Sequence, residues 1–307
     1  MTHDLDDTLV TGAPASEGVN ESIMPLWRQR LNVFVQNKLA VASVTFLVLI
    51  SLACYLMPWL HPTNQTNQAA NFNIPWNQSP SWSHPLGTDS SGYDVLGRIF
   101  YGGEYSLTLG FFSGIITIVI GTIYGMISGF FAGVTDTIMM RLLDALLSIP
   151  YLFLLITLIT IFGRTTAFLI LIIGLTLWWG NARIIRGDAL LIRNLEYSQA
   201  STAMGASKLH IIRRHVFPNS ISNIVTVATF SVADAILFLS ALGFLGLGIQ
   251  SPQTDWGTML QLGSVQFQNG YWWEVFPLAT VFILVVVSIN YIGDALRDAF
   301  EVRLLER

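Results

Sequence analysis

The residue types that most often carry enzyme chemistry occur in this chain, but they are not arranged for catalysis. The five histidines are scattered along the sequence, and none of them has the spacing of metal ligands. Neither a G-x-x-x-x-G-K-[ST] phosphate-binding loop nor a G-x-S-x-G nucleophile turn occurs. We therefore expect a protein that is not an enzyme, does not hydrolyse ATP itself, and binds no metal or other cofactor.

The most informative stretch runs from residue 195 to residue 219, between two apolar blocks. Its composition predicts a short alanine-rich helix, a break at Gly205, and a second short helix that ends before Pro218. Ala200, Ala203 and Gly205 carry almost no side chain, so another surface could approach the backbone closely. Larger apolar side chains stand beside them at Met204, Leu209, Ile211 and Ile212. This pattern is typical of a projection that docks into a partner's groove, but amphipathic helices on a lipid surface would also show it.

The sequence around this stretch is that of a membrane protein. Of its 307 residues, 52% are hydrophobic and only 11% are charged, with a mean hydropathy of +0.57. Soluble domains carry about 25% charged residues, so much of this surface must face a solvent other than water. Six apolar blocks are long enough to span a bilayer, and they must be helical because lipid offers no hydrogen-bond partner to the backbone. Their expected bounds are 39–60, 107–132, 139–162, 165–182, 221–247 and 275–292.

The basic residues predict the orientation of these spans. With both termini in the cytoplasm, 13 of the 15 lysines and arginines face the cytoplasm, which is the arrangement that membrane proteins favour. Residues 1–38 and 295–307 then form cytoplasmic tails, the first 25 residues being flexible. Residues 61–105 form an extracytoplasmic segment, and residues 183–219 form a cytoplasmic loop.

Asp234 falls near the middle of the fifth span, where a charged group is costly unless it faces the protein interior or a wet cavity. Two interpretations are open. Asp234 could line a passage through the membrane, or it could take part in a structural hydrogen bond with Ser231, Ser240 or the backbone.

Small residues and a proline should shape the second and third spans. Glycines four residues apart let membrane helices approach closely, either within this chain or between two subunits. They are Gly121, Gly125, Gly129 and Gly133. Pro150 should kink the third span, and Arg141 and Asp144 should pair one helical turn apart.

The 195–219 stretch resembles the coupling loop of ABC importer permeases, which reads E-A-A, three residues, G, nine residues, and I-x-L-P. Gly205 stands at the motif glycine. The flanking residues resemble the form found in the dipeptide/oligopeptide/nickel branch, E-Y-x-x-A-A-x-x-x-G-A-S and R-H-x-L-P-N, with Ser201 and Phe217 as departures. The resemblance implies a contact with a partner ATPase through Glu196, Tyr197, Ala200, Ala203, Gly205, Ala206, Ser207, Arg214, His215 and Pro218.

Further motifs extend this resemblance over most of the chain from His84 onward. Residues 84–89 together with Gly92 and Asp94 resemble the H-P-L-G-T-D-x-x-G-R-D-V-L segment of the C-type subunit in this branch. Residues 244–248 resemble its F-L-G-L-G, and residues 293–298 its G-D-x-L-R-D. One departure is larger, because this chain has Leu239 where many relatives carry a glutamate.

The resemblance implies an all-α membrane protein with the type I ABC importer transmembrane fold, whose permease domain spans residues 106–294. It implies a pore subunit of a peptide importer in the inner or plasma membrane, with nickel as the alternative substrate. The implied partners are a second, homologous permease, two cytoplasmic ATPases that hold ATP and magnesium, and an extracytoplasmic binding protein; no nucleic acid is implied.

Two other classes of function predict different behaviour. An ion-coupled carrier or channel would work without any ATPase, but the sequence shows no internal repeat of the kind that marks such carriers. A membrane enzyme would need a cluster of polar catalytic residues at one depth, and the sequence shows none.

Overall fold

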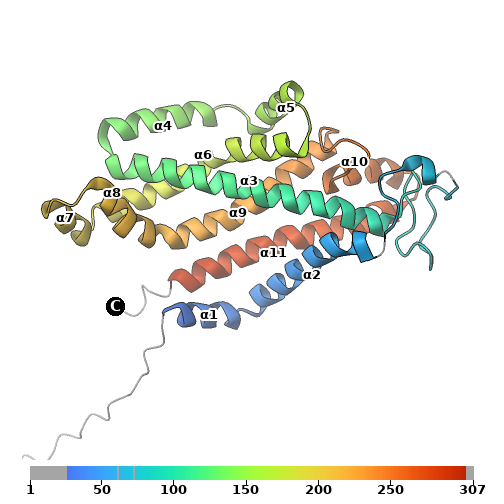
Figure 1. The fold of residues 1–307 in the computed structure, drawn as a ribbon, viewed down its shortest axis with the longest axis horizontal. Coiled ribbons are helices and arrows are strands. Elements are labelled where there is room, and N and C mark those ends of the chain that lie inside the picture. The colour runs from blue at the N-terminus through green and yellow to red at the C-terminus, as the bar shows by residue number, and fades with distance from the viewer. Residues whose placement is uncertain (1–25, 61, 72, 302–307) are drawn as a thin grey trace, which may run out of the picture.

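The protein is described by a computed structural model, which covers residues 26–60, 62–71 and 73–301. Every regular element in these ranges is helical, and one isolated bridge joins Thr88 and Asp94. The longest helices run roughly along one common axis (Figure 1). The predicted flexible tail of 25 residues and residues 302–307 lie outside the described residues.

Five helical stretches in the described chain are long and apolar enough to cross a membrane. They are α2 (Lys38–Leu60), α3 (Val95–Phe131), α6 (Thr166–Arg193), the continuous stretch Lys208–Phe244 that ends in α9 (Phe217–Phe244), and the stretch Trp272–Phe300 that contains most of α11 (Phe276–Glu301). A bent pair, α4 (Gly133–Leu147) and α5 (Tyr151–Phe162), raises the number to six if the pair is one span. The chain is thus a multi-pass membrane protein.

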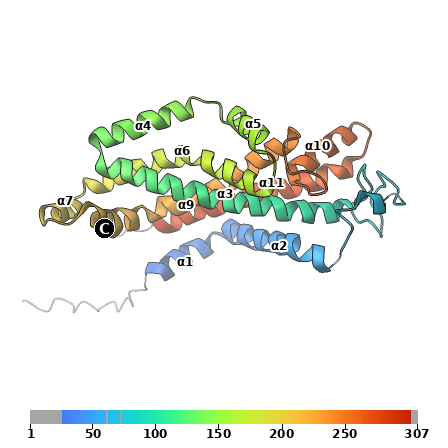
Figure 2. The ribbon, with the colours of Figure 1, turned by 45° about the horizontal axis from the view of Figure 1, so that its top comes forward.

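The predicted third span is broken rather than kinked. α4 and α5 meet at an angle of 80° across residues 148–150. Pro150 has no N–H with which to continue the ladder of α4, and its extended ψ of 118° separates α4 from α5. Figures 1 and 2 show α4 and α5 on the side of α3 and α6 that faces away from α1 and α2.

Several other helices extend beyond their predicted ends. α3 begins at Val95 rather than near residue 107, since Asp94 caps its first turn and the polar residues that follow hide the helix from hydropathy. α6 continues to Arg193, and α11 to Glu301. The predicted N-terminal tail contains an eleven-residue helix, α1 (Leu26–Gln36).

The core lies where α3 crosses its neighbours. One buried cluster surrounds Trp256, the first residue of α10 (Trp256–Phe267), and includes Ile99 of α3 and Ile236 of α9. A second cluster joins α3, α5, α6 and α9 around Leu109, Leu155, Ile173 and Leu239. Gly114 of α3 lets α9 pack closely, since a Cβ there would lie 2.7 Å from the side chain of Val232.

Two loops lie at opposite ends of the long axis in both views (Figures 1 and 2). The α6–α9 loop, residues 194–216, contains the short helices α7 (Glu196–Ala203) and α8 (Lys208–Ile211) and a π-helical turn, η2 (Ile212–Val216). The α2–α3 loop, residues 61–94, contains one 3-10 turn, η1 (Gln68–Asn71). A second 3-10 turn, η3 (Trp272–Glu274), precedes α11.

Candidate functional site

The α6–α9 loop forms a projection at one end of the molecule. α7 ends in a turn at Gly205, whose φ of +82° favours glycine. The hydroxyl of Ser207 then caps α8 by accepting from the N–H of His210 at 3.3 Å. The predicted break at Gly205 is therefore present, and it turns the chain back toward the membrane helices (Figure 1).

Most of the residues predicted for partner contact are exposed on this projection. Met204 at 80% and Leu209 at 63% exposure are its two prominent apolar side chains. Small residues lie next to them, so a partner surface could reach the backbone at this point. The exposed predicted residues are Glu196, Tyr197, Ala200, Ala203, Gly205, Ser207, Arg214 and Pro218, whereas Ala206 and His215 are half-buried.

Two of the apolar residues expected on the docking face point inward instead. Ile211 is only 1% exposed and belongs to a buried cluster with Ile192 and Val216, against which Ile212 packs. The reason is the helical period, because α8 and η2 must cover the end of α6 with one face. The exposed apolar surface of the loop is therefore smaller than predicted.

Ser201, which departs from the family form, links the two halves of the loop. Its hydroxyl accepts or donates a hydrogen bond of 3.0 Å with Nε2 of His215 and lies 2.9 Å from the carbonyl of Tyr197. The ring of Tyr197 also packs against that of His215, with centroids 5.5 Å apart. These contacts hold α7 on η2, so the predicted residues Tyr197 and His215 also stabilise the loop, although Tyr197 itself is exposed.

Pro218 does not end a helix, contrary to the sequence-based prediction. The helical path continues without interruption from Lys208 to Phe244, and Pro218 lies in the first turn of α9. The N–H of Phe217 bonds to the carbonyl of Ile212, five residues earlier, and this wider turn accommodates a residue that has no N–H. The side chain of Asn219 donates to the carbonyl of His215 at 2.6 Å.

Polar contacts tie the helices next to the loop together. Arg186 of α6 pairs with Asp136 of α4, with Nη2 and Oδ2 2.6 Å apart. Asn223 of α9 donates to the carboxylate of Asp188 of α6 at 2.7 Å. Asp144 pairs with Arg183 of α6 at 2.6 Å rather than with its neighbour Arg141 as predicted, since the broken span brings α4 against α6.

The glycine spacing of α3 serves packing within this chain. A Cβ at Gly125 would lie 2.5 Å from the carbonyl oxygen of Ala182, and one at Gly129 would lie equally close to that of Arg186. Gly121 also abuts α6, whereas Gly133 has open space around it and a φ of +57° at the turn into α4. The sequence left open whether these glycines pack within the chain or between two subunits. Three of the four pack against α6 of the same chain.

Asp234 is exposed on α9, and no hydrogen bond connects it to Ser231 or Ser240 in the described chain. Ser231 bonds instead to the carbonyl of Val227 and to the amide of Asn181, both at 2.7 Å. One turn after Asp234, Phe238 packs edge-to-face on Tyr151 of α5, with ring centroids 4.4 Å apart. The carboxylate thus lies beside the break between α4 and α5.

Leu239, where the resemblance would place a glutamate, is fully buried in the second core cluster. A glutamate there would need a polar partner that this cluster of apolar side chains does not offer. Asp234 is not its substitute, because Asp234 faces outward from the same helix.

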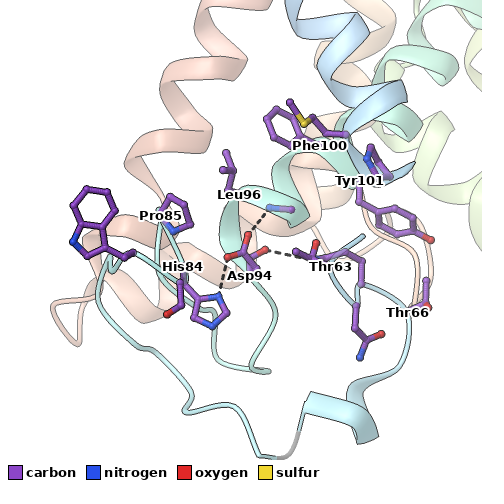
Figure 3. Close-up of a pocket in the computed structure, with 15 residues that line it drawn as sticks. Thr63, Thr66, His84, Pro85, Asp94, Leu96, Phe100 and Tyr101 are labelled. Atoms are coloured by element: carbon purple, nitrogen blue, oxygen red, sulfur yellow. Dashed lines mark hydrogen bonds and ion pairs between the residues drawn. The ribbon is translucent and has the colours of Figure 1, made fainter. Parts of the chain in front are cut away.

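The α2–α3 loop at the opposite end holds the H-P-L-G-T-D motif, and most of its polar atoms are hydrogen-bonded internally. Asp94 accepts from the N–H of Gly97 at 2.7 Å, which caps α3, and pairs with Nδ1 of His84 at 3.0 Å (Figure 3). Thr88 is fully buried and donates to the carbonyl of Pro75. Burial raises the pKa of Asp89, although N–H groups of Tyr93 and Ser91 partly offset the effect.

A cavity of about 520 Å³ lies between this motif, the end of α2 and the first turns of α3. Figure 3 shows His84 and Asp94 on one side, with Phe100 and Tyr101 on another. We call it the α2–α3 cavity. Sequence reasoning did not identify it, because it forms only when residues 57–66, 82–85 and 94–101 come together. No group of three His, Cys, Asp or Glu residues in the described ranges is placed to hold a metal.

Residues 104–306 match the family described as the binding-protein-dependent transport system inner membrane component. The chain belongs to this transport family. Residues 25–80 also match the N-terminal transmembrane domain of oligopeptide transport permease C.

Individual relatives of this family cover nearly the whole chain. It is 39% identical to the oligopeptide transport system permease protein OppC of Haemophilus influenzae, covering 90% of this chain and 88% of the relative. It is 38% identical to the dipeptide transport system permease protein DppC of Bacillus subtilis, with coverages of 88% and 83%. A solved structure of the MetNI methionine ABC transporter in an inward-facing conformation aligns with a TM-score of 0.53 at 22% identity, covering 67% of this chain and 96% of that one. The fold is thus that of type I ABC importer transmembrane domains, as predicted.

Proposed function

We propose that this chain is one of two pore-forming subunits of an ATP-driven peptide importer in the inner or plasma membrane. The observation that carries this proposal is the α6–α9 loop, which leaves small residues and two large apolar side chains exposed at the end of a continuous membrane helix. The names of the oligopeptide and dipeptide permease relatives support peptide as the substrate class.

The proposed complex contains a second, homologous permease, two cytoplasmic ATPases and an external peptide-binding protein. In this arrangement the α6–α9 loop and both termini are cytoplasmic, as the distribution of basic residues predicts. ATP and magnesium belong to the ATPases, since this chain has no phosphate-binding loop.

The proposed mechanism is alternating access. When ATP closes the ATPase pair, each docking groove carries its α6–α9 loop with it. Because α8, η2 and α9 are helical without interruption, movement of the loop moves α9 itself. ATP binding then favours one of two states of the membrane helices by a difference in binding free energy, and hydrolysis resets them.

Asp234 is proposed to line the passage. A carboxylate exposed on a membrane helix would be costly against lipid, so its face of α9 belongs against the second permease or a wet cavity. The neighbouring break at residues 148–150 supports the same orientation, because non-helical backbone at membrane depth is tolerated only away from lipid.

The first experiment is to tag the chain in its native host, purify it in mild detergent, and identify its partners by mass spectrometry. We expect a homologous permease and one or two ATPases with phosphate-binding loops. The complex is then reconstituted in liposomes with its binding protein, and uptake of labelled dipeptides, oligopeptides and nickel is measured with and without ATP. Nickel uptake alone would contradict the peptide assignment, and uptake by the isolated chain without ATPase would contradict the importer.

A further inference from the structure

The α2–α3 cavity combines apolar walls with a polar side. Met57, Phe100 and Tyr101 contribute apolar surface from the end of α2 and the start of α3. Across from the aromatic residues, His84 and Asp94 form a hydrogen-bonded pair (Figure 3). When Nδ1 of a neutral imidazole donates to the carboxylate, its Nε2 is a hydrogen-bond acceptor. The cavity thus offers acceptors to a guest that has an apolar stem and a donor head group.

The charge of the cavity favours a basic guest. None of the fifteen residues that line it is lysine or arginine, and Asp94 carries the one formal charge among them. Arg98, in the second turn of α3, is turned away from solvent, because its guanidinium donates to the carbonyls of Gln65 and Pro252. The phosphate of a lipid head group would therefore find no cationic partner in the lining.

An exposed aromatic side chain, that of Trp82, stands at the edge of the cavity. Trp82 is fully exposed. The turn that carries it is held by hydrogen bonds from the N–H of Ser81 to the carbonyl of His84, and from the N–H of His84 to the hydroxyl of Ser81. Its exposure thus results from an ordered turn. Tryptophan is enriched among protein-binding hot spots, and the ring of an exposed tryptophan can also bind a cation.

We propose that the α2–α3 cavity is a docking site for a lysine or arginine side chain of the external binding protein. The stem of this side chain would lie along Phe100 and Tyr101, and its head group would meet the His84–Asp94 pair and the face of Trp82. This inference rests on the proposed function, because it requires a binding protein that docks from outside. Complementary charge would give docking its register and a fast association rate.

The test uses the complete permease–ATPase complex in nanodiscs and the purified cognate binding protein, with the Kd measured by biolayer interferometry. Ser83 lines the cavity and is exposed. Ser83→Lys should weaken binding about tenfold through like-charge repulsion, whereas Ser83→Glu should bind as well as the wild type or more tightly. Trp82→Ala should weaken binding about tenfold. Trp76→Ala is the matched control, since Trp76 is exposed in the same loop but does not line the cavity.

Three outcomes would overturn the inference: wild-type affinity in both Ser83→Lys and Trp82→Ala, tighter binding by Ser83→Lys, or an equal loss in Trp76→Ala. Basal ATPase activity of each variant confirms that the complex has assembled. Failure of the proposed function would look different. The wild-type complex would then bind no binding protein at all and would transport without one.

Discussion

The α6–α9 loop and the α2–α3 loop both carry recognisable motifs, but they use them in opposite ways. In the α6–α9 loop, Gly205 and the small residues of α7 remain exposed, as a surface kept for another protein would be. In the α2–α3 loop, Thr88 and Asp94 are buried and hydrogen-bonded within the chain: Thr88 bonds to the carbonyl of Pro75, and Asp94 caps α3. A motif can therefore indicate either a docking surface or an internal support, and burial distinguishes the two.

Gly205 offers the most direct test of this difference between the two loops. A Cβ at this residue would meet no atom within 4 Å, but the φ of +82° disfavours other residues. Gly205→Glu adds a charge where we expect a close contact with the ATPase, so uptake and substrate-stimulated ATPase activity should fall to background in proteoliposomes. Gly205→Asn, which tolerates this backbone conformation and is neutral, should retain more activity. Normal stimulation in Gly205→Glu would show that the exposed turn is not a docking surface.

A second variant pair separates docking from support within the α6–α9 loop. Ile211→Ala removes a buried side chain, so we expect a loss of about 2–5 kcal/mol in stability, seen as earlier thermal unfolding. Leu209→Ala, at an exposed site in the same short helix, should change stability by less than about 0.5 kcal/mol but weaken binding of the ATPase. Equal effects on stability would contradict the division of α8 into a buried and a docking face.

Asp234 tests whether the region between the two loops has a function of its own. Asp234→Leu should lower peptide uptake about tenfold while the complex still assembles, because a carboxylate in the passage would be replaced by an apolar group. Asp234→Asn should lower it less, since it keeps a polar side chain. The measurement is initial uptake into proteoliposomes, and normal uptake by Asp234→Leu would refute the pathway role.

The smallest effect is expected at the other end of the molecule. Asp94→Ala removes the cap of α3 and should cost about 1 kcal/mol of stability. Asp94→Asn keeps a capping oxygen and should recover most of that loss. Thermal unfolding of the purified complex measures both. An unchanged melting temperature in Asp94→Ala would show that Asp94 does not support α3, whereas a weaker response to the binding protein is expected because Asp94 also lines the α2–α3 cavity.

The apolar blocks were predictable because length and hydropathy follow from the need to satisfy the backbone within lipid. The exposed turn at Gly205 was also predictable, since composition marked both the break and the small residues around it. The burial of Ile211 was not predictable, because it depends on which face of α8 packs against α6. Hydropathy likewise missed the first turns of α3, where Arg98 and Glu104 interrupt an otherwise apolar pattern.

The break at Pro150 and the continuity at Pro218 show a further limit of the sequence. Pro150 lies within one apolar block and Pro218 just before another, yet Pro150 precedes a new helix after an 80° bend, whereas Pro218 lies inside a continuous helical path. The difference arises from η2, whose wider turn precedes Pro218, whereas the residues before Pro150 form no such turn. The α2–α3 cavity was equally hidden, since three separated segments form it.

The path from Lys208 to Phe244 also has a mechanical consequence. It packs against α3 at Val232 and Ile236, where Gly110 and Gly114 leave room for them. At about 1.5 Å per residue, the arm from Lys208 to Val232 measures about 36 Å and the arm from Ile236 to Phe244 about 12 Å. A rigid lever that tilts about this crossing reduces motion in the same ratio. A displacement imposed at α8 would therefore be about threefold smaller at the far end of α9, and the force there would be about threefold larger.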